Sequence, residues 1–112
     1  MRETWHDNVN VSLRWADAAA RDLFGRPIPQ ILLLHVGAFD AVMIDDLLSQ
    51  YEKLGVRFVS LDEALRDRIY TDPPPDTTSP GGGFLHQFRK ARGTRTTPPP
   101  TQPAALLDAL CR

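Results

Sequence analysis

A run of aliphatic residues ends in a histidine within this 112-residue chain. Ile31 begins the run Ile-Leu-Leu-Leu, and His35 follows it directly. Pro27 and Pro29 precede the run, which is too short for a buried helix, so it predicts a strand covered on both faces. Because open α/β sheets and barrels place their chemistry at the carboxyl ends of strands, His35 is either a catalytic group or a structural histidine.

No other group in the sequence has the spacing to join His35 in a metal site. His6 stands alone before the first predicted helix and His86 lies in the tail, so both are expected to be surface histidines. Asp40 is expected to cap a helix, with the pair 45–46 in its solvated first turn. Since a zinc site needs three or four converging ligands, no metal-binding residue is predicted in this chain.

Helical periodicity and turn residues divide the first part of the chain into alternating elements. The first predicted helix has Asn10 or Ser12 as its N-cap and Gly25 just past its end. Ser60 and Glu63 form a capping box for a later short helix. The predicted elements are a helix at 12–24, a strand at 31–35, a helix at 40–54 with one apolar face that includes Ile44 and Leu47, a strand at 56–59 and a helix at 61–67. This order predicts a βαβ unit with parallel strands and a right-handed crossover.

Beyond residue 70 the composition changes to proline and glycine, which predicts a linker. A helix is expected at 84–91 and a last helical turn at 104–110. The basic cluster that includes Arg89, Lys90 and Arg92 is expected to be a solvated helix face. We therefore predict two regions, 1–70 as a folded α/β part and 71–112 as a Pro/Gly-rich linker with a short helical tail.

The composition excludes several classes of protein. With 13 basic and 14 acidic residues the net charge is −1, which predicts neither a nucleic-acid nor an anionic-membrane partner. The single cysteine, Cys111, can form no internal disulfide. The N-terminal residues lack the apolar core of a signal peptide, and no apolar stretch approaches the ~20 residues of a membrane span. The chain as written is expected to be cytoplasmic.

Two parallel strands do not make a domain, because both edges stay open and most of each face is uncovered. The predicted strand at 31–35 nevertheless has the composition of a strand buried on both sides. The sequence therefore implies neighbours that it does not contain. Either an oligomer supplies them, or the chain is the carboxyl-terminal piece of a larger α/β fold.

Residues 23–70 resemble the last part of the polysaccharide deacetylase family, which includes chitooligosaccharide and peptidoglycan deacetylases. The likeness rests on Leu-Leu-His at 33–35, on Gly-Val-Arg-Phe-Val-Ser-Leu at 55–61 and on Asp-Glu-Ala-Leu at 62–65, as in one bacterial branch of the family. The resemblance implies a partial (β/α) barrel, of which this chain would hold the C-terminal βαβ unit. It also implies a hydrolase that removes N-acetyl groups from carbohydrate with a divalent metal, usually zinc.

The same resemblance assigns roles to two residues. His35 would be the general acid that protonates the departing amine, and Leu33 would line the apolar pocket for the acetyl methyl. The family's Thr-Phe-Asp-Asp and His-x-x-x-His motifs, which supply the base and the metal ligands, do not occur in these 112 residues. The chain alone is therefore expected to hold no cofactor and to be inactive, and its expected partners are an N-acetylated carbohydrate and the missing N-terminal barrel portion.

A second hypothesis is a non-catalytic interaction or dimerisation module that binds through exposed apolar helix and strand edges. Both hypotheses predict apolar surface on the monomer. Ordering the backbone costs roughly 1–2 kcal/mol per residue, and burial in so short a chain has to offset it. The purified monomer is therefore expected to be partly unfolded or self-associated.

Overall fold

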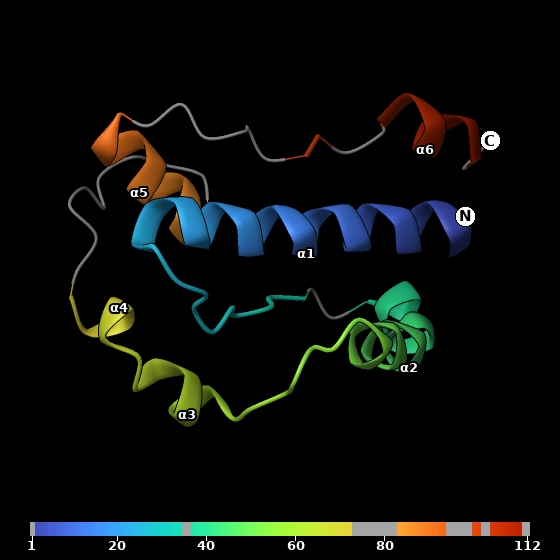
Figure 1. Ribbon diagram of the computed structural model, residues 1–112. Helices are drawn as coiled ribbons and strands as arrows, with labels where there is room; N and C mark the ends of the chain where they lie inside the picture. The colour runs from blue at the N-terminus through green and yellow to red at the C-terminus, as the bar shows by residue number, and fades with distance from the viewer. Residues whose placement is uncertain (1, 35–36, 73–82, 94–99, 102–103, 111–112) are drawn as a thin grey trace. The chain divides into compact units, whose positions relative to one another are not determined.

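The computed structural model describes residues 2–34, 37–72, 83–93, 100–101 and 104–110. Among these residues the regular structure consists of six helices (Figure 1): α1 (Arg2–Phe24), α2 (Ala38–Lys53), α3 (Leu61–Leu65), α4 (Arg68–Thr71), α5 (Phe84–Arg92) and α6 (Ala104–Leu110). The chain divides into two compact units. Unit 1 joins Met1–Ile28 to Asp72–Arg112, and unit 2 is Pro29–Thr71.

The predicted α/β fold, a partial (β/α) barrel with a βαβ unit, is wrong: the regular structure of the described residues is all helical, and they contain no strand. The segment 31–34 is irregular, and Ile31, Leu32 and Leu33 are 49%, 48% and 82% exposed. The second predicted strand, 56–59, is also irregular, and Phe58 is exposed. A strand forms only when a neighbouring strand accepts and donates its backbone hydrogen bonds. The described part of the chain contains no such ladder.

Helix α1 begins at Arg2, well before the predicted start at Ser12. The apolar spacing continues toward the N-terminus, and the side chains that continue it are half-buried: Trp5, Val9 and Leu13. Asn10 therefore lies inside the helix instead of capping it. Burial of the apolar side chains that precede it stabilises the longer helix more than a cap at Asn10 would stabilise a shorter one.

Glycines end both long helices, as predicted. Gly25 and Gly55 have positive φ angles of 69° and 83°, which a residue with a side chain rarely adopts. The Gly25 N–H donates to the Arg21 carbonyl at 2.8 Å. After α2, the Val56 N–H donates to the Tyr51 carbonyl at 3.0 Å, as in a Schellman motif. These bonds satisfy carbonyls that the helix itself leaves without a donor.

The buried face of α2 differs slightly from the predicted one. Met43, Leu47 and Tyr51 are buried, whereas Ile44 is 41% exposed. The three buried residues are spaced four apart and so form one row along the helix. Leu47 is buried as predicted, but Met43 is buried in place of Ile44.

Unit 1 has its core where α1 meets α5 (Figure 1). The rings of Phe24 and Phe88 meet edge to face with their centroids 5.1 Å apart, a favourable arrangement for aromatic pairs. Arg92 donates from Nη1 to the Leu23 carbonyl at the end of α1, and its guanidinium lies 5.3 Å from the Phe24 ring centroid. The predicted helices at 84–91 and 104–110 are confirmed as α5 and α6.

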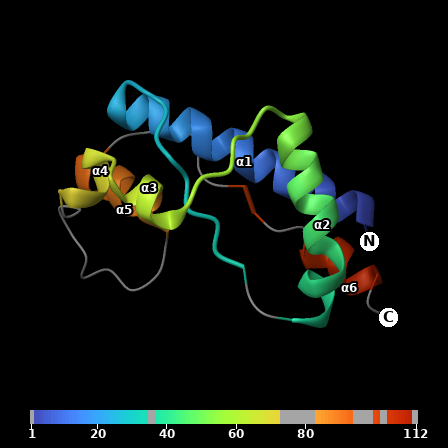
Figure 2. The ribbon, with the colours of Figure 1, turned by 90° about the horizontal axis from the view of Figure 1, so that it is seen from below.

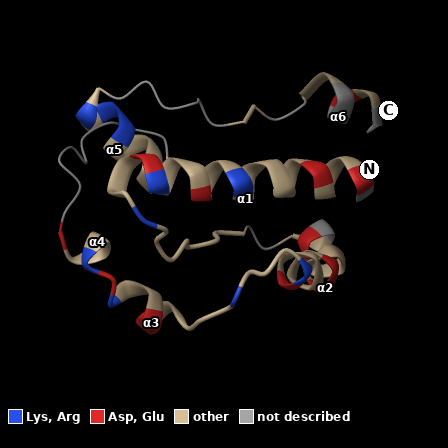
Figure 3. Ribbon diagram, viewed as in Figure 1, with Lys and Arg blue, Asp and Glu red and all other residues tan. Residues whose placement is uncertain are grey.

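The basic residues of α5 do more than form the predicted solvated face. Figure 3 shows basic positions on α5, which carries Arg89, Lys90 and Arg92 in its last turn and no acidic residue in its first. Arg92 is turned toward α1 by the contacts just described. It supplies a cation at the C-terminal end of α1, where the helix dipole favours positive charge.

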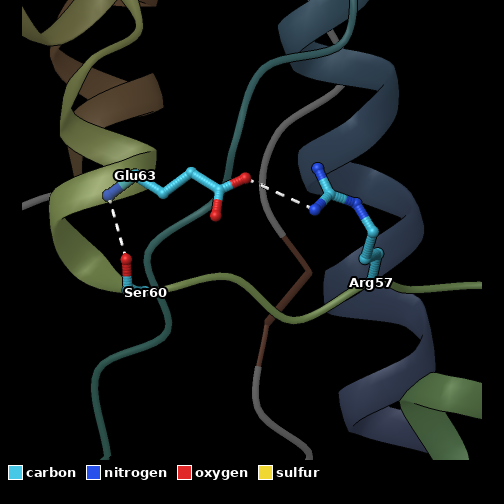
Figure 4. Close-up of polar contacts among 3 residues, drawn as sticks. All are labelled: Arg57, Ser60 and Glu63. Atoms are coloured by element: carbon cyan, nitrogen blue, oxygen red, sulfur yellow. Dashed lines mark hydrogen bonds and ion pairs between the residues drawn. The ribbon is translucent and has the colours of Figure 1, made fainter.

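In unit 2 the short helices α3 and α4 lie side by side (Figure 2). Ser60 is the N-cap of α3, and its Oγ accepts from the Glu63 N–H at 3.1 Å, so this half of the predicted capping box is confirmed. The Glu63 carboxylate instead accepts from Arg57 at 3.3 Å (Figure 4). Asp67 immediately precedes α4 and caps its start, since its Oδ1 accepts from the Ile69 N–H at 3.0 Å.

Ser60→Ala removes the side-chain acceptor of α3 and is expected to lower the free energy of unfolding by about 1 kcal/mol. Ser60→Asp restores an acceptor at the same position and is the matched control. Amide exchange at Glu63 measures the effect, because this N–H loses its bond in the alanine variant and keeps it in the aspartate variant. Equal protection of that amide in both variants would contradict the assignment of Ser60 as the cap.

Candidate functional site

The predicted catalytic residue, His35, lies outside the described residues. On its N-terminal side the chain arrives through the irregular segment that contains Leu33. On its C-terminal side α2 begins, with Gly37 as the N-cap. In the sequence His35 thus lies between an apolar segment and a helix, and its catalytic role stays a prediction.

Leu33, the predicted residue of the acetyl pocket, is 82% exposed. Its neighbours Ile31 and Leu32 are also exposed. An apolar pocket for a methyl group needs cover on several sides. For Leu33 to serve as predicted, further apolar surface has to come from outside unit 2.

Asp40 does not cap α2 as predicted. The N-cap is Gly37, which has extended backbone (φ −148°, ψ 162°) and makes no side-chain cap hydrogen bond. Asp40 lies in the first turn, and its Oδ2 would be 3.6 Å from a Cβ on Gly37, so the carboxylate turns back toward the helix start. A negative charge there is stabilised by the positive end of the helix dipole.

The other two histidines lie in unit 1. His86 is exposed on α5, as predicted. His6 is half-buried on α1 instead of exposed, with its ring 5.4 Å from that of Trp5. Its Nε2 is buried and has no hydrogen-bond partner among the described residues. The apolar face that extends α1 toward its N-terminus explains this burial.

The described residues include no group of three or more His, Cys, Asp or Glu side chains placed to hold a metal ion. Over the same residues, no helix is long and apolar enough to span a membrane.

A hydrogen bond joins the two ends of unit 2. The Tyr70 hydroxyl donates to the Pro29 carbonyl at 2.5 Å. Burial raises the pKa of Tyr70 above its ordinary value of 10.0, and the negative charge of Asp67 raises it further. The bond ties the start of the segment that leads to Leu33 and His35 to helix α4. Local sequence patterns do not indicate this contact, because it joins residues far apart in the chain.

Tyr70→Phe is expected to lower the free energy of unfolding by about 1 kcal/mol at neutral pH, the usual net value of one hydrogen bond. Because the folded chain raises the pKa of Tyr70, this group contributes stability below pH 10, which is lost as the pH rises through the raised pKa. The alkaline loss of stability should therefore be smaller in the phenylalanine variant. Some loss should remain, since burial also raises the pKa of Tyr51.

Urea unfolding at pH 7 and at pH 11, followed by circular dichroism, measures both effects. Tyr51→Phe is the matched control for the loss of the bond at pH 7, because it removes a tyrosine hydroxyl without touching the Pro29 carbonyl. The same alkaline loss in the Tyr70 variant as in the original chain would contradict this role of Tyr70.

In comparisons with protein-family models, curated proteins and solved structures, no match to this chain was found.

Proposed function

We propose that this chain is the carboxyl-terminal part of a polysaccharide deacetylase, in which His35 protonates the amine released when an N-acetyl group is hydrolysed. The observation that carries the proposal is the series of motifs at 33–35, 55–61 and 62–65. All of these motifs lie within unit 2, Pro29–Thr71.

The chemistry of amide hydrolysis assigns one task to this chain. The reaction needs an activated water, a polarised carbonyl and a proton for the poor amine leaving group. A histidine that titrates near neutrality suits the third task. The family's motifs for the base and the metal ligands do not occur in this sequence. In this proposal the metal, the base and most of the substrate pocket belong to the rest of the enzyme.

The exposed apolar segment before His35 supports the proposal that further parts of the enzyme cover this surface. Ile31, Leu32 and Leu33 follow one another and are all exposed. Soluble proteins seldom leave contiguous apolar side chains in water unless another surface covers them. The remainder of a deacetylase would provide such a surface and would also place substrate beside Leu33 and His35.

The test begins with the genomic DNA immediately upstream, which should encode Thr-Phe-Asp-Asp and His-x-x-x-His in frame. The protein translated from the joined region is expected to bind zinc and to release acetate from an N-acetylglucosamine oligomer. The 112-residue chain alone is expected to do neither. Stoichiometric zinc in the chain alone would overturn the proposal, as would a joined protein that binds zinc and releases no acetate.

A second candidate is a module that pairs with a second copy of itself. Of the large hydrophobic residues exposed in the described structure, all except Val11 lie in unit 2. The apolar segment around Leu33 carries no charged residue between Arg26 and Asp40, so two copies could approach there without like-charge repulsion. Unrelated upstream DNA would favour this candidate over the deacetylase.

Under this second candidate, Leu33→Glu is expected to weaken self-association at least ~10-fold, because each copy would have to bury a carboxylate. Val11→Glu is the matched control, since Val11 is also exposed, at 51%, but lies on α1 in unit 1. Sedimentation equilibrium of the two variants measures the effect. Equal weakening by both substitutions, or a monomeric original chain, would exclude pairing through Leu33.

A further inference from the structure

We draw no further inference here: the strongest candidate, the exposed apolar surface of Ile31, Leu32 and Leu33 in the irregular segment before α2, belongs to the site already described, and nothing in the described part of the structure shows what covers it.

Discussion

His35→Ala, made in the longer protein that includes the upstream deacetylase region, is expected to lower turnover by ~100-fold or more. A positioned general acid typically contributes about 10²–10⁴ to the rate, because the amine is a poor leaving group without a proton. The metal content should not change, since His35 is proposed as an acid and not as a ligand. Acetate release and metal analysis on the same preparation test both statements.

His86→Ala is the matched control for this experiment. His86 is exposed on α5 in unit 1, so its loss should leave turnover unchanged. Loss of metal from the His35 variant would show that His35 is a ligand and that the proposed role is wrong. A similar fall in turnover in both variants would show that the effect arises from folding and not from proton transfer.

The helices could be predicted from sequence because their signals are local. Glycine at 25 and 55 ends α1 and α2, and the Ser60 side chain caps α3, all within a few residues of the helix that each one bounds. Periodicity also located α5, which begins at Phe84 as predicted. The start of α1 was misplaced by many residues, since Asn10 and Ser12 have good capping side chains but lie within a continuing apolar face. The short helix α4 was not predicted: a single helix at 61–67 was expected, whereas α3 ends at Leu65 and α4 follows at Arg68–Thr71.

The sheet was predicted wrongly, because a strand depends on more than local signals. Ile31 and Leu32 have the side chains of a buried strand, but a strand also depends on a partner that the apolar run does not specify. The contacts that tie distant segments together were missed for a similar reason. Nothing in the local sequence indicates that Tyr70 bonds to the Pro29 carbonyl or that Arg92 bonds to the Leu23 carbonyl.

For the candidate site, the sequence predicted the order of its parts but not their surroundings. Asp40 has the side chain of a cap, yet Gly37 takes that position because its extended backbone already begins the helix. Leu33 was predicted to line a pocket, but it is exposed because no described residue of unit 2 packs over its side chain. Local sequence predicts helix ends and side-chain chemistry. The burial of a side chain instead depends on residues that are far away in the sequence or belong to another chain.

Among the substitutions expected to change stability, Arg92→Met should have the largest effect, because Arg92 joins α5 to α1 in two ways. Its guanidinium donates to the Leu23 carbonyl, which lies in the last turn of α1, where carbonyls have no donor within the helix. It also lies 5.3 Å and 5.8 Å from the ring centroids of Phe24 and Phe88. A hydrogen bond with a charged donor contributes roughly 1.5–3 kcal/mol.

The methionine variant is therefore expected to lower the free energy of unfolding of unit 1 by about 2 kcal/mol, since methionine keeps the apolar stem and loses both the donor and the charge. Arg92→Lys should give a smaller loss, because an ammonium keeps the charge near the Phe24 ring but lacks the planar fork of the guanidinium. Arg14→Met removes the same kind of side chain from α1 and should change little: both arginines are exposed, but the bond to the Leu23 carbonyl and the contacts with the two rings belong to Arg92. Guanidinium chloride unfolding followed by circular dichroism compares the three variants. If the substitutions at Arg92 and Arg14 lowered stability equally, the effect would be one of general charge, and the bond from Arg92 to the end of α1 would not hold the two helices together.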